Sequence, residues 1–144
     1  NLAVAACTNL NLPLTVIGNG PEHGNLVNVA GTSINFLTDA DDDRITEILA
    51  SSQAFIFPGL DDFGIAPVEA LAAGTPVIAY GAGGALDYVI PGKTGEFFAE
   101  QTVESLCETL EKFNHKSYKP KEIQIFAQKF SIENFRKNLF SKIS

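Results

Sequence analysis

The residues with the clearest chemical potential lie in one stretch near the middle of the chain, between positions 57 and 79. Two carboxylates, Asp61 and Glu69, stand on either side of Gly64, which falls at the expected start of a helix. The backbone N–H groups in the first turn of a helix have no acceptors within the helix, and the helix dipole favours negative charge there. A loop of this kind predicts a phosphate-binding turn that needs no lysine.

The groups around this turn suit a ligand that carries sugars as well as phosphates. The free N–H donors at the helix start belong to Phe63, Gly64, Ile65 and Ala66. Glu69 lies one turn inside the helix, where its carboxylate can accept two neighbouring hydroxyls, as on a ribose. Asp61 precedes the helix, so a nucleotide sugar could place one sugar on each carboxylate with the phosphates between them. On the residues alone an alternative stays open, in which Asp61 and Asp62 cap the helix and Glu69 is a solvated helix residue.

Short apolar runs must provide the strands that position this loop. They recur about every 20 residues, they are rich in β-branched and aromatic residues, and turn residues bound them. The runs are Leu14–Ile17, Ile34–Leu37, Ala54–Phe57, Val77–Tyr80 and Glu96–Phe98. Three of them lack polar alternation, which indicates burial on both faces and therefore a parallel sheet. Ligands of such sheets bind at the carboxyl edge of the strands, the edge at which Asp61 is expected.

Helical patterns fill the segments between these runs. Three aspartates at 41–43 form an acidic first turn, and an apolar stripe from Ile45 follows. Pro67 falls in the first turn of the next helix and Gly74 ends it, and a third helix covers Val103 to Leu110. The alternation predicts a Rossmann-like, doubly wound α/β domain. We expect one domain over residues 1–144, with a helical tail at about 120–144.

Composition and charge narrow the class of protein. The chain has 144 residues, of which 45% are hydrophobic and 19% charged, and its formal net charge is −7. Residues 1–111 carry two basic residues against 15 acidic ones, whereas residues 112–144 carry eight basic residues and two acidic ones. Nucleic-acid binding depends on phosphate neutralisation by Lys and Arg, so no nucleic-acid partner is expected. Cys7 and Cys107 form no CxxC pair, which is typical of a reducing, cytoplasmic setting.

Several other motifs fail on spacing. Gly92-Lys93-Thr94 resembles the end of a P-loop, but position 87, where that motif requires glycine, is Asp. Gly18-Asn19-Gly20 follows the first expected strand, yet the third glycine of a dinucleotide fingerprint falls one residue late. The alternating aspartates from Asp39 lack the glycine and glutamate of a calcium loop. His23 and His115 stand alone, so no metal site is expected.

The central stretch also resembles a known family. Asp61 to Ala79, with Gly81-Ala82-Gly83-Gly84 behind it, is similar to the donor-binding half of family-4 retaining glycosyltransferases of GT-B fold, and most similar to bacterial mannosyltransferases. The likeness covers nearly the whole chain, including Ile34–Leu37 and the end from Phe130 to Phe135. Its most specific part is the Phe-Gly-Ile-x-Pro-x-Glu core followed by Ala-x-Gly-Thr-Pro-Val-Ile-Ala.

This resemblance implies roles at matching positions. Asp61 and Glu69 occupy the two acidic positions of the family's motif, separated by seven residues, and would face the transferred sugar and the nucleoside ribose. The backbone from Phe63 to Ala66 would hold the diphosphate, and the loop after Leu37, including Thr38 and Ala40, would line the base. The resemblance also implies transfer with retention and without a metal, with GDP-mannose or a UDP-sugar as donor.

The sequence departs from the family pattern in two ways that affect the expected activity. The first acid is Asp61 where the family has Glu, and the family's preceding strand and N-terminal domain are expected to be missing from this sequence. We therefore expect this sequence to be an N-terminally truncated piece of an enzyme of cell-surface glycan synthesis. We expect the piece alone to be inactive as a transferase. The missing domain would be its partner. A UDP-dependent glucosyl- or N-acetylglucosaminyltransferase and a non-catalytic sugar-nucleotide-binding module remain alternatives. The tail lysines could also meet the inner face of the membrane, although packing of the tail's phenylalanines is favoured.

Overall fold

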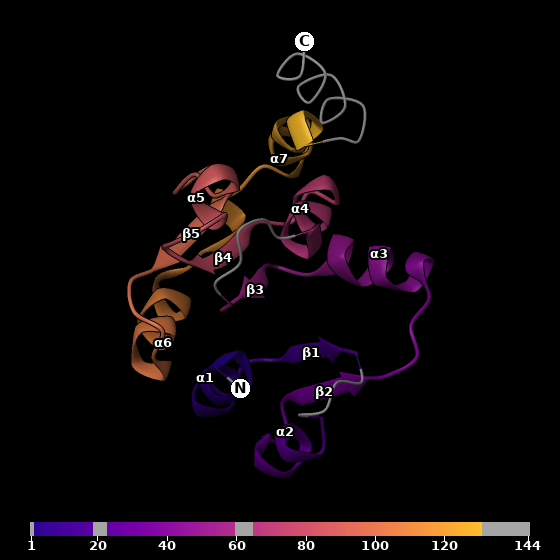
Figure 1. Ribbon diagram of the computed structural model, residues 1–144, viewed down its shortest axis with the longest axis vertical. Helices are drawn as coiled ribbons and strands as arrows, with labels where there is room; N and C mark the ends of the chain where they lie inside the picture. Colours follow the sequence, from indigo (N-terminus) through magenta and orange to yellow (C-terminus); the bar gives the residue numbers. More distant parts are fainter. Residues whose placement is uncertain (1, 19–22, 60–64, 131–144) are drawn as a thin grey trace.

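The computed structural model describes residues 2–18, 23–59 and 65–130, in which helices and strands alternate along most of the chain (Figure 1). The elements are α1 (Leu2–Leu10), β1 (Leu14–Ile17), α2 (His23–Val29), β2 (Ile34–Leu37), α3 (Asp42–Ser51), β3 (Phe55–Phe57), α4 (Ile65–Ala72), β4 (Val77–Tyr80), α5 (Ala85–Tyr88), β5 (Gly95–Phe98), α6 (Val103–Lys112) and α7 (Pro120–Ala127). Short 3-10 turns, η1 (His115–Ser117) and η2 (Gln128–Phe130), flank α7.

The described strands pair only in parallel and form two sheets. β1 pairs with β2, and β4 lies between β3 and β5 in a three-stranded sheet. Each parallel pair is joined by a crossover that contains a helix, as the geometry of parallel strands demands. The predicted α/β class with parallel strand pairing is thus confirmed, although the described strands form two sheets where one was expected.

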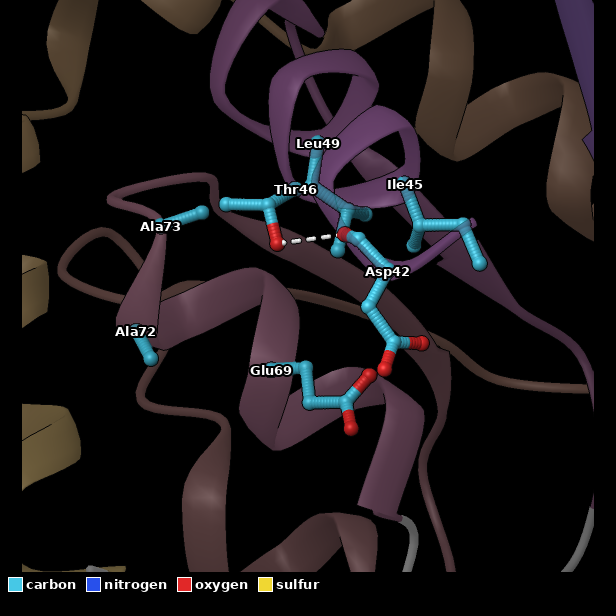
Figure 2. A pocket seen from close by; sticks show the side chains of 7 residues that line it. All are labelled: Asp42, Ile45, Thr46, Leu49, Glu69, Ala72 and Ala73. Atoms are coloured by element: carbon cyan, nitrogen blue, oxygen red, sulfur yellow. Dashed lines mark hydrogen bonds between the residues drawn. The ribbon is translucent and has the colours of Figure 1, made fainter. Parts of the chain in front are cut away.

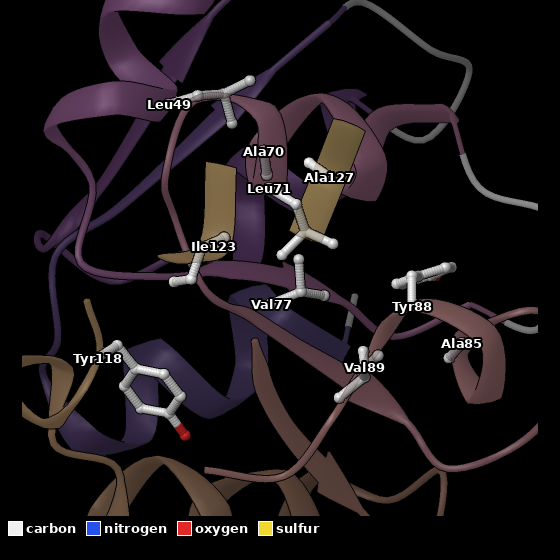
Figure 3. Packing of buried hydrophobic residues seen from close by; sticks show 11 residues of the cluster. Leu49, Ala70, Leu71, Val77, Ala85, Tyr88, Val89, Tyr118, Ile123 and Ala127 are labelled. Atoms are coloured by element: carbon white, nitrogen blue, oxygen red, sulfur yellow. The ribbon is translucent and has the colours of Figure 1, made fainter. Parts of the chain in front are cut away.

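The three-stranded sheet is covered on both faces, and alternate residues of its strands pack into different clusters. Val77 and Ala79 belong to a cluster with residues of α4, α5 and α7, which Figure 3 shows from close by. Their neighbour Ile78 packs instead with Ala6 of α1 and with Phe98 and Leu106. Since side chains alternate across a strand, this division places α4 and α7 on one face and α1 and α6 on the other. A sheet buried on both faces explains the continuous apolar runs in its strands.

Helix α1 links the two sheets. It packs along α6 on the three-stranded sheet and also contacts β2. The hydroxyl Oγ1 of Thr8 accepts a hydrogen bond of 3.1 Å from the backbone N–H of Gly31, just before β2. A side chain at Gly31 would place its Cβ 2.9 Å from the Thr8 methyl, so this close approach favours glycine.

The boundaries of the predicted strands agree closely with the structure. The runs Leu14–Ile17, Ile34–Leu37 and Val77–Tyr80 are strands with the same bounds. β3 begins at Phe55 rather than Ala54, and β5 begins at Gly95 rather than Glu96. Helices α2 and α5 had no sequence signal: α2 has no buried residue, and α5 has only four residues.

The tail begins as predicted, with Pro120 in the first turn of α7. Ile123 and Ala127 are buried against the cluster that contains α4, and Phe126 and Phe130 pack at its edge. The second predicted tail helix lies outside the described residues. None of the helices in the described segments is long and apolar enough to cross a membrane.

Candidate functional site

One face of α3 forms the first wall of the candidate site. Asp41 is the N-cap of this helix, and its Oδ1 accepts a hydrogen bond of 2.8 Å from the backbone N–H of Arg44. With 3.6 residues per turn, side chains at spacings of three and four share one face. The stripe that faces α4 consists of Asp42, Ile45, Thr46 and Leu49. The acidic first turn predicted from the three aspartates is confirmed, and Asp41 is the residue that caps the helix.

Helix α4 forms the second wall, and it begins at the carboxyl edge of the three-stranded sheet. Its first described residues are Ile65 and Ala66. Pro67, the third residue, has no N–H to leave unpaired. The helix ends at Ala72, and Gly74 follows with a φ of +86°. The N–H groups of Gly74 and Thr75 bond to the carbonyls of Leu71 and Ala70, both at 2.9 Å, as in a Schellman motif.

A hollow of about 430 Å³ lies between these two helices (Figure 2). From α4 it is lined by Glu69, Ala72 and Ala73, which share one face at the same helical spacing. Ile45, Leu49 and the two alanines make an apolar floor, whereas the carboxylates of Asp42 and Glu69 reach into the same end of the hollow. The volume lies in the range of small-molecule sites. A partly apolar groove rimmed by acceptors fits a ligand with a flat apolar part and N–H or O–H donors.

A buried hydrogen bond holds the two walls together at the far end of the hollow. The Thr75 side chain, which is 1% exposed, donates from its hydroxyl to the Leu49 carbonyl at the end of α3. The backbone N–H of Ser52 donates to the same carbonyl at 3.2 Å. These bonds fix the end of α3 against the turn that leads from α4 into β4. The separation of Asp42 from Glu69 therefore depends on rigid elements rather than on surface loops.

Of the predicted site residues that the structure describes, Glu69 is the one that lines the hollow. Glu69 is exposed, and its carboxylate makes no hydrogen bond or ion pair with any described residue, so it is available to a ligand. Ile65 and Ala66 stand at the start of α4. Thr38 and Ala40 follow the carboxyl end of β2 on the way to α3, and Thr38 is exposed. The predicted residues Asp61, Phe63 and Gly64 lie outside the described residues.

Asp42 is the site residue that the sequence reasoning missed. The three consecutive aspartates were all assigned to the acidic first turn of the helix, yet only one residue can occupy the N-cap. Successive helical residues are turned by about 100°, so Asp42 and Asp43 cannot both face α4. The periodic stripe formed by Asp42, Ile45 and Leu49 was the available signal, because it places that aspartate on the apolar face of α3.

A second hollow, of about 550 Å³, lies near the amino end of β5 and is therefore remote from the carboxyl edge. Its centre is Glu96, whose Oε1 accepts hydrogen bonds of 3.0 Å from the Gly92 N–H and 3.0 Å from the Tyr118 hydroxyl. Burial, reinforced by the bond to Glu96, raises the pKa of Tyr118 well above its ordinary value. These contacts join the η1 segment to β5, which gives this hollow a structural explanation.

The remaining reactive groups of the described residues form no second site. Cys7 and Cys107 are both free thiols at the contact of α1 with α6. Burial, with a smaller effect from Cys107, raises the pKa of the Cys7 thiol to about 11. Within residues 2–18, 23–59 and 65–130, no three His, Cys, Asp or Glu side chains gather as a metal ion would require.

Comparison with known proteins decides the family. The model of the family described as "Glycosyl transferases group 1" matches residues 2–130, which include both walls of the hollow. The chain belongs to the group 1 glycosyl transferases. It is also 32% identical to alpha-1,3/1,6-mannosyltransferase ALG2 of Dictyostelium discoideum, in an alignment of 110 positions that covers 72% of this chain.

Solved structures confirm the fold expected for a group 1 glycosyl transferase. Alr3699/HepE of Anabaena, solved with UDP and glucose, superposes on 99% of this chain with a TM-score of 0.77 at 19% identity. Sucrose-phosphate synthase of Thermosynechococcus elongatus gives a TM-score of 0.70 over 99% of the chain, also at 19% identity. The architecture is that of the GT-B glycosyltransferases, as the sequence resemblance implied. The chain spans 26% of the length of the mannosyltransferase and 43% and 51% of these two structures.

Proposed function

We propose that this chain is the donor-binding domain of a retaining glycosyltransferase that transfers a hexose from a nucleotide sugar in cell-surface glycan synthesis. Mannose from GDP-mannose is the favoured donor, which the likeness to a named mannosyltransferase supports. The observation that carries the proposal is the position of the Glu69 carboxylate, which has no partner among the described residues and lies in the hollow between α3 and α4 of a group 1 glycosyl transferase. Because the chain spans only part of its relatives, the activity is assigned to a longer enzyme, called the parent enzyme below.

The site residues then take the following roles. Glu69 accepts hydrogen bonds from the ribose hydroxyls, and Asp61 does the same for the hydroxyls of the transferred sugar. Thr38 and Ala40 line the base. The backbone N–H groups of Ile65 and Ala66, with those of Phe63 and Gly64, bind the diphosphate. Supporting this assignment, the described part of α4 begins at Ile65, after the carboxyl end of β3, and the first N–H groups of a helix have no acceptors within it.

The chemical contribution of this domain is electrostatic. Transfer breaks the bond between the anomeric carbon and the diphosphate, so negative charge grows on the departing phosphate oxygen. Fixed N–H donors at a helix start stabilise that charge without reorganising during the reaction. We include metal independence in the proposal, since the N–H donors supply the positive potential. Transfer by the parent enzyme should then continue unchanged in the presence of a chelator.

A matched pair of variants in the parent enzyme tests the role of Glu69. Both Glu69→Gln and Glu108→Gln remove one exposed carboxylate, but Glu108 lies on α6, across the sheet from the hollow. A charge-assisted hydrogen bond contributes roughly 1.5–3 kcal/mol. Glu69→Gln should therefore weaken nucleotide-sugar binding by about 10- to 100-fold, measured by calorimetry, while Glu108→Gln should leave it unchanged. Equal affinities for the two variants would contradict the proposal.

Transfer assays separate the alternatives for the whole enzyme. GDP-mannose, UDP-glucose and UDP-N-acetylglucosamine are offered in turn, and NMR of the product gives the anomeric configuration. Binding and transfer from a UDP-sugar alone would replace the mannose assignment with the UDP-dependent one. Binding without transfer or donor hydrolysis would indicate a non-catalytic sugar-nucleotide-binding module. The 144-residue chain alone should bind weakly and transfer nothing above contaminant level, because acceptor contacts are assigned to the rest of the parent enzyme.

We also propose that the parent enzyme is cytoplasmic and makes a peripheral contact with the inner face of the membrane. Within the described part of the tail, Phe126 packs at the edge of the core and Lys129 lies 4.1 Å from its ring centre. These contacts favour packing of this part of the tail over membrane insertion. Failure of the parent enzyme to bind anionic vesicles at low salt would remove the membrane contact from the proposal.

A further inference from the structure

The Asp42 carboxylate caps no helix and pairs with no side chain among the described residues. The N-cap of α3 is already supplied by Asp41, and Arg44 pairs with Glu47 at 3.4 Å. The Asp42 carboxylate makes no hydrogen bond or ion pair with any residue that the structure describes, although its backbone carbonyl accepts a bond of 2.9 Å from Thr46. Its side chain reaches into the same end of the hollow as Glu69 (Figure 2).

The surroundings of Asp42 restrict what it can bind. An ionised carboxylate is an acceptor only, so each of the two acids at this end of the hollow requires N–H or O–H donors from the ligand. The floor beneath them, formed by Ile45, Leu49, Ala72 and Ala73, offers apolar surface to a planar ring. If Glu69 takes the ribose hydroxyls, the second acceptor faces the remaining part of the nucleoside, which is the base.

The common bases differ in what they offer to a carboxylate. Guanine carries N1–H and N2–H₂ side by side, and these two donors match the two oxygens of one carboxylate. Uracil carries a single N3–H between two carbonyl oxygens, which a carboxylate repels. We propose that Asp42 is a specificity-determining residue that accepts hydrogen bonds from the donor edge of guanine, so that this site selects a guanosine diphosphate sugar over a uridine one. The inference rests on the proposed function and names the base of its donor.

The neighbouring Asp43 provides a matched control. It carries the same charge on the same first turn of α3, and it is exposed, but it does not line the hollow. Asp42→Asn and Asp43→Asn therefore remove the same favourable interaction with the helix dipole, so their effects on stability should be alike. Only Asp42→Asn replaces a bidentate acceptor in the hollow with a group that presents one acceptor and one donor.

The test measures the affinities of GDP and UDP for the parent enzyme by calorimetry. A good bidentate pair with a base edge discriminates by roughly 5- to 150-fold, so the wild type should prefer GDP by at least about fivefold. Asp42→Asn should lose about that factor for GDP and keep or improve its affinity for UDP. Asp43→Asn should match the wild type for both nucleotides.

The outcomes separate this inference from the proposed function. If the wild type binds UDP as tightly as GDP, or if Asp42→Asn and Asp43→Asn give the same GDP-to-UDP ratio, the assignment of Asp42 is wrong. Sugar transfer by the enzyme and sensitivity to Glu69→Gln would leave the proposed function standing in that case. If neither nucleotide binds the wild type, the donor-binding function fails and the role of Asp42 fails with it.

Discussion

Gly95 has the closest neighbour of the described glycines, and its replacement by alanine gives a sharp test of the fold. Gly95 opens β5 directly opposite Val77 of β4. A Cβ added at Gly95 would lie 1.7 Å from the Val77 carbonyl oxygen and 2.7 Å from its carbonyl carbon. Carbon and carbonyl oxygen approach no closer than about 3.3 Å even in favourable contacts. The two strands would therefore have to separate locally by roughly 1.5 Å.

Separating the two strands lowers the free energy of unfolding in two ways. Overpacking a dense interior costs about 1–3 kcal/mol. The shift also strains the bond of 2.9 Å from the Val77 N–H to the Thr94 carbonyl, which contributes about 1 kcal/mol. The expected loss is thus about 2–4 kcal/mol, a large part of the 5–15 kcal/mol typical of a whole domain.

Urea unfolding of the chain, followed by far-ultraviolet circular dichroism, measures this loss. With a slope of about 2 kcal/mol per molar urea, Gly95→Ala should lower the midpoint by about 1–2 M. Gly24→Ala is the control, because a Cβ there meets nothing within 4 Å and alanine favours the helix α2. A Gly95→Ala midpoint within about 0.3 M of the wild type would refute the register of β4 and β5, given that slope.

Three further predictions concern the walls of the site and the contact of α1 with α6. Thr75→Val removes the hydroxyl that donates to the Leu49 carbonyl. Because Ser52 still donates to that carbonyl, the free energy of unfolding in urea should fall by only about 1 kcal/mol. An unchanged free energy of unfolding would contradict the link between α3 and α4. Asp41→Ala removes the N-cap of α3 and should cost about 1 kcal/mol, whereas Asp43→Ala should cost less because it caps nothing. Burial raises the pKa of Cys7 from its ordinary value of 9.0 to about 11, so the unfolded chain loses this proton first as the pH rises. The resulting stabilisation is complete below pH 9, and up to about 3 kcal/mol of it is lost between pH 9 and 11. In a Cys7→Ala variant the free energy of unfolding should therefore fall less steeply over that range.

The sequence predicted the strands well because their apolar runs reflect burial on both faces. Val77–Tyr80 is flanked by turn residues and lies in the middle of the three-stranded sheet, so pattern and structure agree. Gly95 was not predicted to be in the strand because glycine has low strand propensity. Glycine is required there because the Val77 carbonyl leaves no room for a Cβ. A contact between segments about 20 residues apart leaves no local signal.

The part of the candidate site that lies on α4 could be predicted from the sequence. Glu69 was identified from the acidic residues around the start of α4, and the structure places it in the hollow. Asp42 was not identified because its role depends on how α3 packs against α4, which the bond between Thr75 and Leu49 helps to fix. Tertiary packing determines which of the three adjacent aspartates lines the hollow. The local sequence pattern does not distinguish them.

The parallel pairing of every described strand has a consequence for how the protein folds. Leu14 pairs with Ile34, Phe55 with Val77, and Val77 with Gly95, so each pair closes a long loop and no hairpin can begin a sheet. The loop that joins β3 to β4 includes α4, the helix that bears Glu69. Closing the sheet and placing the Glu69 carboxylate are therefore the same folding event. During refolding, recovery of nucleotide binding should follow completion of the sheet and never precede it.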